Sequence, residues 1–257
     1  MSDRDRVRQR PGQKREHRGG GLETLYPSLY AGQSDLSTVL QAARRSTTVK
    51  IREIVALREQ VVDELWPRLW ACARDMALAL RAHGSIWVFG NGGSAADAQA
   101  LTQLYLAPPA GQPLPATALT NDAAVVTALA NDVGFEVVFA RQIAAFAKAG
   151  DIAIGLSTSG NSVNVLRAFD EAAQRGLLTV GFAGYDGGQM AEADTIAYVF
   201  VVPAASVHRI QEAQTTLYHL LWELTQEALQ EGGAENEQQV HAARGGTCIP
   251  PRCIPEG

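Results

Sequence analysis

Apolar residues recur at three- and four-residue spacings along the first patterned part of the chain, residues 34–82. This period is typical of amphipathic helices, and Ser34 and Asp35 offer an N-cap where it begins. Pro67 interrupts the pattern, so we expect a second helix to begin near it and to stop at Gly84. The pattern predicts an N-terminal helical extension whose apolar faces need a partner, either the domain itself or another subunit.

From Ser85 the pattern changes to short apolar runs that alternate with segments of helical period. The runs predict strands at residues 86–89, 115–119, 151–156, 177–182 and 196–202; the segments between and after them predict helices at residues 95–106, 122–130, 135–148, 162–175, 187–193 and 206–230. The strands are apolar along nearly their whole length, as a parallel sheet covered on both faces requires. Five parallel strands with right-handed crossovers predict an α/β fold, a flavodoxin-like three-layer sandwich with an N-terminal helical extension.

The two ends of the chain lack this periodicity. Residues 1–20 carry seven Arg or Lys against three acidic residues, although the net charge of the whole chain is −5. We expect residues 1–33 to form a disordered basic tail and residues 231–257, rich in Gly, Glu and Gln and then Pro, to form a second tail. Residues 34–230 are then a single domain, with its sheet between residues 85 and 202. The basic tail is the one segment suited to a nucleic acid or a protein partner.

The sequence also indicates where in the cell the protein is expected. No apolar segment approaches the roughly 20 residues needed to cross a bilayer, and no apolar run follows the basic N-terminus as it would in a secretory signal. The three cysteines form no even set: Cys72 lies in an amphipathic segment and is expected to be buried, while Cys248 and Cys253 lie in a Pro-rich tail without a nearby His. We expect a cytoplasmic protein.

A glycine-rich turn follows the first predicted strand. It comprises Asn91, Gly92, Gly93 and Ser94, and it leads directly into a predicted helix. Glycines let the backbone approach a ligand closely, and the first N–H groups of a helix favour an anion. A purely structural tight turn would have the same composition, so this loop alone does not establish a site.

A second loop, at residues 157–162, follows the third predicted strand and opens another helix. It holds four hydroxyl residues in six, namely Ser157, Thr158, Ser159 and Ser162. Capping the helix requires only one of them. Neither loop matches the motif for nucleotide hydrolysis, and the first lacks the spacing for a dinucleotide. Hydroxyl donors without a lysine indicate a monophosphate on a small polar body, such as a sugar phosphate.

Five motifs in this order and spacing resemble the sugar isomerase (SIS) domain family, and within it the phosphoheptose isomerases. They are GNGGSAADAQ from residue 90, LTND with AND from residue 119, LSTSGNS from residue 156, GYDGG from residue 184 and HRIQE from residue 208. The resemblance covers roughly residues 50–230. It implies an α/β sandwich that assembles as a homotetramer around its helices. It also implies the aldose–ketose isomerisation of sedoheptulose 7-phosphate.

By position, the resemblance assigns phosphate binding to the hydroxyl residues of the two loops, Ser94, Ser157, Thr158, Ser159 and Ser162. It places Asn91 and Asp122 along the sugar. Gln211 and His219, on the last long helix, match two of the four groups that coordinate zinc in many members of the family. Both are therefore candidate metal ligands, and Gln211 is also a candidate substrate ligand.

The other two family positions are a His and a Glu, six and ten residues after the loop serine. In this chain they are Ala100 and Leu104, and the family's Asp before the RIQE motif is His208. Alanine and leucine neither bind a metal nor move a proton. Two protein ligands are too few to hold zinc stably, so we expect no cofactor.

Three readings follow from this departure. The chain is an isomerase with a rearranged site, in which His219 or Asp122 supplies the base; or it binds a sugar phosphate without turnover, as a sensor or assembly part; or it binds another protein, like the SIS-domain factor that binds the bacterial replication initiator. Each residue also has a structural alternative. His219 suits a packed helix position, Gln211 a helix surface and Asp122 a helix cap.

Overall fold

The computed structural model describes residues 36–244, and it describes side-chain surroundings for residues 37–231. The chain forms two compact units, Met1–Ile51 and Arg52–Gly257. In the first unit, residues 36–51 are helical and the side chains from residue 37 are exposed. The predicted basic tail at residues 1–33, together with Cys248 and Cys253, lies outside the described residues. The sheet and the helices packed on it belong to the second unit.

Five parallel strands form the centre of this unit, in the order β2-β1-β3-β4-β5. Their bounds are β1 Ile86–Gly90, β2 Ala116–Ala118, β3 Ile152–Ser157, β4 Leu178–Gly184 and β5 Tyr198–Val202. Each of the five predicted strands is present within two residues of its expected ends. The order is that of the flavodoxin-like fold, so the predicted fold class is confirmed.

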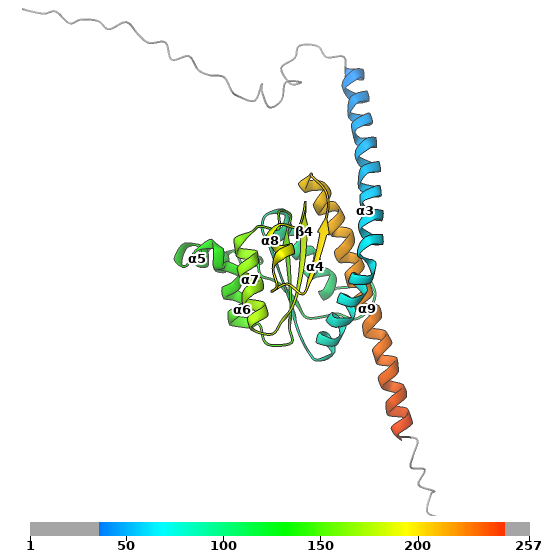
Figure 1. Ribbon diagram of the computed structural model, residues 1–257, viewed down its shortest axis with the longest axis vertical. Coiled ribbons are helices and arrows are strands. Elements are labelled where there is room, and N and C mark those ends of the chain that lie inside the picture. The colour runs from blue at the N-terminus through cyan, green and yellow to red at the C-terminus, as the bar shows by residue number, and fades with distance from the viewer. Residues whose placement is uncertain (1–35, 245–257) are drawn as a thin grey trace, which may run out of the picture. The chain divides into compact units, whose positions relative to one another are not determined.

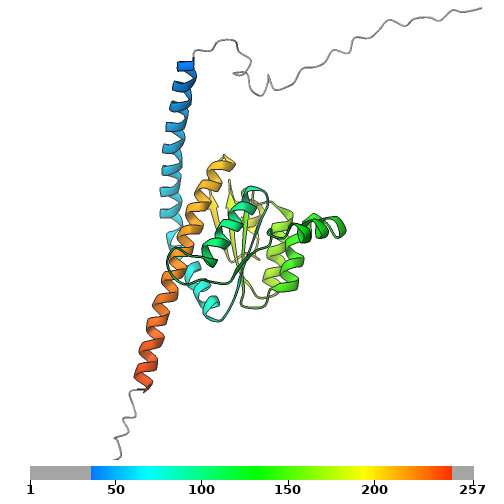
Figure 2. The same ribbon diagram turned by 180° about the vertical axis from the view of Figure 1, so that it is seen from behind.

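Helices cover both faces of the sheet (Figures 1 and 2). One face carries α4 Gly93–Leu106, α9 Val207–Arg244 and the later part of α3 Leu36–Arg81. The other carries α6 Val138–Phe146, α7 Val163–Gln174 and the short α8 Gly188–Glu192. Two further elements, α5 Ala123–Asp132 and the 3₁₀ turn η1 Phe135–Val137, precede α6.

Side chains alternate between two separate cores because successive residues of a strand face opposite sides of the sheet. In β1, Ile86 and Val88 pack with α3, α4 and α9, whereas Phe89 packs with α6 and α7. Phe89 contacts both Phe139 and Phe169 in the second core, with ring centroids 5.6 and 5.2 Å away. Burial on both faces explains the uninterrupted apolar runs in the sequence.

The N-terminal helical prediction needs one correction. Pro67 lies inside α3, which continues to Arg81, and no second helix begins there. A proline removes one main-chain donor from a helix, and buried neighbours on both sides, Val61 and Leu69, hold the helix in place. The predicted stop is confirmed: His83 adopts a left-handed conformation (φ 63°), and the N–H of Gly84 bonds to the carbonyl of Ala79.

The last helix also differs from expectation. We expected it to end at residue 230, but α9 continues to Arg244. Arg81, the last residue of α3, donates hydrogen bonds to the carbonyls of Ala228 and Leu229. A charged donor on main-chain carbonyls fixes the end of α3 against this part of α9. Within the part of the chain that the structure describes, no helix is long and apolar enough to span a membrane.

Candidate functional site

The order of the sheet reverses between β1 and β3, which pair directly, with Gly90 opposite Leu156. Because both strands are parallel, their carboxyl ends meet at the same edge, and the loops that follow them are neighbours. Ligands of open α/β sheets bind in the crevice at this reversal point. The two loops singled out in the sequence are the loops at this point.

The first loop turns sharply into α4. Gly92 has a positive φ of 57° and precedes the first helical residue, Gly93. Ser94, in the first turn, is only 5% exposed. The loop therefore presents the amino end of a helix that opens with two glycines, which suits close approach by an anion.

The second loop gathers its hydroxyl groups. Ser157 Oγ lies 3.0 Å from Ser162 Oγ and 3.5 Å from Ser159 Oγ. Ser162 occupies the N-cap position of α7 but makes no capping hydrogen bond with its side chain. The capping explanation for this serine therefore does not hold, and the hydroxyl faces the serine cluster. Thr158, between them, is partly exposed.

An amide pair joins the two loops. Asn91 Nδ2 donates to Asn164 Oδ1 at 2.8 Å, and Asn164 Nδ2 donates back to Asn91 Oδ1 at 2.9 Å. Asn164 is 3% exposed and was not anticipated from the sequence, because no motif links it to residue 91. The pair fixes the start of α7 next to the loop before α4.

The start of α9 lies beside the two loops. A Cβ atom at Gly93 would collide with the amide of Gln211, so this glycine makes room for that side chain. Gln211 Nε2 donates to Asp97 Oδ2 at 3.2 Å. Gly184 likewise leaves no space for a side chain between the Thr158 carbonyl and Ile210. Gln211 thus lies at the mouth formed by the two loops.

His219 lies elsewhere on α9. Its Nδ1–H donates to the Thr215 carbonyl at 2.8 Å, and the exposed ring stacks on Tyr218. The ring borders a groove of about 530 Å³ between α3 and α9, which is lined by Arg58, Val62, Trp66, Thr215, Thr216, His219, Leu220 and Glu223. Eight residues of helix separate it from Gln211, or about 12 Å along the axis.

The side-chain hydrogen bonds of Asp122 are local and do not reach the serine cluster. Its Oδ1 accepts hydrogen bonds from the N–H groups of Ala124 and Val125, both at 3.0 Å, and it is the N-cap of α5. The side chain is exposed. The structure thus gives this residue the capping role that its position after Asn121 also suggested.

The set of four zinc ligands that the resemblance implied does not fit the residues present. Ala100 and Leu104 lie on α4 where two ligands would be needed, and Leu104 packs against the core. Gln211 is hydrogen-bonded to Asp97, and His219 borders the α3–α9 groove. Within residues 37–231, no three His, Cys, Asp or Glu side chains gather as a metal site.

Asp97 is a second residue at these loops, after Asn164, that the sequence did not indicate. It is half-buried on α4, and burial raises the pKa of its carboxyl group, an effect that the hydrogen bond from Gln211 partly offsets. Burial also raises the pKa of Tyr218, which lies on the same side of α9 as Gln211. The negative charge of Asp97 adds to that rise. Asp97 lies within the first motif, but on this helix the family resemblance assigns reactive groups only to positions 100 and 104.

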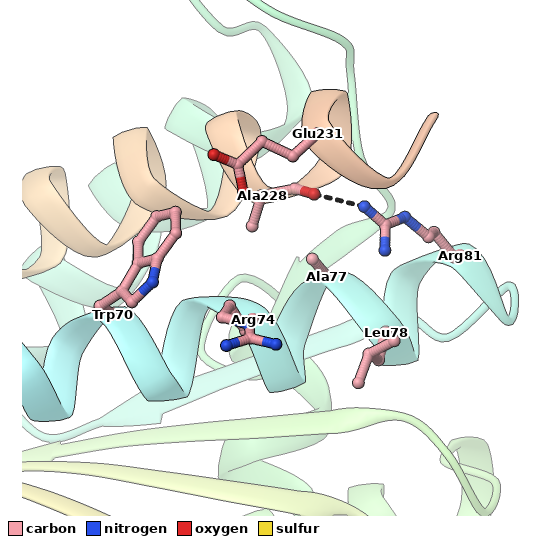
Figure 3. Close-up of a pocket in the computed structure, with 7 residues that line it drawn as sticks. All are labelled: Trp70, Arg74, Ala77, Leu78, Arg81, Ala228 and Glu231. Atoms are coloured by element: carbon pink, nitrogen blue, oxygen red, sulfur yellow. Dashed lines mark hydrogen bonds between the residues drawn. The ribbon is translucent and has the colours of Figure 1, made fainter. Parts of the chain in front are cut away.

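A second hollow, of about 310 Å³, lies between the end of α3 and α9 (Figure 3). Trp70, Arg74 and Arg81 line it on one side, with Ala228 and Glu231 on the other. Since α3 leads into the first residue of β1, this hollow lies toward the amino edge of the sheet. The two loops are at the opposite edge.

These features define a class: an α/β domain in which two helix-opening loops, residues 91–94 and 157–162, form a cradle at the reversal point of its sheet. The model of the SIS domain matches residues 51–184. The chain belongs to the SIS domain family.

Curated relatives and solved structures agree with this assignment. The chain is 41% identical to the phosphoheptose isomerase of Aquifex aeolicus over 194 residues, which is 75% of this chain and 96% of that protein. It is also 41% identical to the phosphoheptose isomerase of Geobacter metallireducens over 182 residues, 70% of this chain and 95% of that protein. The structure of the phosphoheptose isomerase from Neisseria gonorrhoeae superposes with a TM-score of 0.66 at 34% identity, over 71% of this chain and 98% of that one.

The amide pair between the loops can be tested by a double-mutant cycle. Asn91→Ala leaves the buried amide of Asn164 without its partner, so we expect a loss of about 1–3 kcal/mol in the free energy of unfolding. The double variant Asn91→Ala/Asn164→Ala should lose less than the sum of the single variants. Urea unfolding measures all three. Strictly additive losses would show that the two side chains are not coupled.

The raised pKa of Asp97 makes a prediction about stability and pH. Because the folded state favours the protonated acid, it binds more protons than the unfolded state, and this contribution to stability is lost as pH rises. Asp97→Asn removes the titration. Relative to the parent chain, we expect the variant to gain stability as the pH rises above the ordinary pKa of an aspartate, as measured by urea unfolding. A stability difference independent of pH would contradict the shift; Asp170→Asn, at an exposed carboxylate of α7, is the control.

Proposed function

We propose that this chain binds a ketose phosphate of the sedoheptulose 7-phosphate type and catalyses its aldose–ketose isomerisation. The observation that carries the proposal is the serine cluster of Ser157, Ser159 and Ser162 at the opening of α7, next to the opening of α4. Hydroxyl groups and helix N-termini together suit a phosphate dianion. The names of the relatives at about 41% identity support the isomerisation.

The residues around the cradle suggest how a substrate would be held. The phosphate is bound by the serine cluster, with Ser94 and Thr158 as further donors. Gln211, directly above Gly93, then lies where the sugar chain leaves the phosphate. Isomerisation further requires a base that takes a proton from the carbon next to the carbonyl. We include no metal in the proposal, because Ala100 and Leu104 supply no ligand atom.

A second function, binding of the sugar phosphate without turnover, is favoured by that same loss. The cradle needs none of the groups replaced at positions 100 and 104, so binding persists whether or not chemistry does. The two functions therefore share the site and differ in turnover. A protein partner, bound through the basic residues 1–33, would be a third role independent of the cradle.

One experiment addresses binding and turnover together. Purified full chain is mixed with sedoheptulose 7-phosphate; calorimetry gives the affinity, and proton NMR follows the product, with zinc and with a chelator. We expect binding and turnover that zinc does not change. Ser157→Ala and Ser162→Ala should each weaken binding by roughly 10- to 100-fold, the value of a hydrogen bond to a charged group.

The control for these serines is Ser46→Ala, which removes an exposed hydroxyl from α3. Binding without turnover in the parent chain would reject the isomerase and leave the silent binder. Affinity unchanged in both cradle variants would reject the serine cluster as the phosphate site.

We also propose that the chain acts in the cytoplasm as a homotetramer. The groove between α3 and α9 supports self-association, because Trp66 is 47% exposed beside the apolar Val62. Light scattering of the full chain should give four times the mass of one chain, and Trp66→Glu should lower it. Val133→Glu, at a 46% exposed position on the opposite layer, is the control. A monomeric parent chain would refute the assembly.

A further inference from the structure

The proposed reaction lacks an assigned base. Moving a carbonyl between neighbouring carbons requires a group that removes a carbon-bound proton and returns it one carbon away. Neither Ala100 nor Leu104 can do so. His219 borders the α3–α9 groove, and Asp122 caps α5. The base must therefore come from another side chain near the cradle.

Most carboxylates around the two loops are already engaged at the surface. Asp186 is exposed and accepts the N–H of Gly188. Glu212, next to Gln211, forms an ion pair with Arg209. Among the described residues near the cradle, Asp97 differs from both: it is half-buried, no ion pair neutralises it, and its one side-chain hydrogen bond comes from the neutral amide of Gln211.

The position of Asp97 is also suitable. It lies one helical turn after Gly93, so its side chain projects from the same side of α4 as that residue. Gln211 contacts both, since its amide fills the space above Gly93 and donates to Asp97 Oδ2. The amide thereby fixes one carboxylate oxygen and leaves Oδ1 to meet a substrate. A ligand anchored at the opening of α4 has its next atoms beside this carboxylate.

We propose that Asp97 is the general base of this chain, replacing the groups absent at positions 100 and 104. The inference rests on the proposed isomerase function. It adds the residue that makes turnover possible without those groups, held in place by Gln211 as a positioning residue.

The step balances without an oxidant or a metal. The Asp97 carboxylate takes the proton from the hydroxyl-bearing carbon next to the carbonyl. The electrons of that C–H bond form the C=C bond of an ene-diol, while the carbonyl oxygen gains a proton from water. The acid form of Asp97 then returns its proton to the former carbonyl carbon, and the other hydroxyl loses its proton to water as the new carbonyl forms.

The test compares Asp97→Asn with Asp170→Asn in the full chain, using sedoheptulose 7-phosphate. The amide oxygen introduced at position 97 can still accept the hydrogen bond from Gln211, so we expect folding and substrate affinity to be kept. Turnover should fall by roughly 10²- to 10⁴-fold, the usual contribution of a positioned base. Washing of solvent deuterium into the substrate carbon should fall in parallel. Asp170→Asn should match the parent chain.

Chemical rescue separates proton transfer from a structural role. In Asp97→Ala, added formate supplies a carboxylate for the space left by the side chain, and we expect it to restore part of the turnover. The inference is overturned if the parent chain turns over and Asp97→Asn keeps that rate within threefold, which leaves the proposed function intact. If the parent chain binds the substrate without turnover or exchange, the isomerase function fails first and the inference with it.

Discussion

The direct pairing of β1 with β3 is the constraint on which the site depends. It brings the ends of two strands separated by more than sixty residues of sequence to adjacent positions at one edge of the sheet. Each strand then opens a helix there, α4 and α7, and the amino ends of both helices face the same crevice. The two reciprocal hydrogen bonds between the side-chain amides of Asn91 and Asn164 hold those two openings together.

Much of the fold could be predicted from the sequence because a strand buried on both faces is a continuous apolar run of strand length. These runs predict all five strands, and the segments of helical period predict the helices between them. Pro67 is a position where prediction from local sequence fails. A proline is a local signal, whereas the continuity of α3 is decided by the packing of Val61 and Leu69 on either side of it. The extension of α9 beyond residue 230 was missed because that segment has a polar composition.

The candidate site was predictable to a different degree. The loops have compositions that indicate their role, and the structure brings them together as their strands require. The contacts between side chains of different helices could not be predicted from composition in this way. Gln211 and His219 are eight residues apart, which turns them by about 80° around an ideal helix; which of the two faces the loops depends on how α9 lies on α4. Asp97 and Asn164 are defined by partners more than seventy residues away.

The close contact between Gly93 and Gln211 also affects the free energy of ligand binding. Since the Gln211 amide occupies the volume that a side chain at residue 93 would need, the cradle and the start of α9 form one surface. A ligand that binds only this assembled surface stabilises it by its own binding free energy. Binding of such a ligand and the docking of the start of α9 on α4 would therefore be thermodynamically linked.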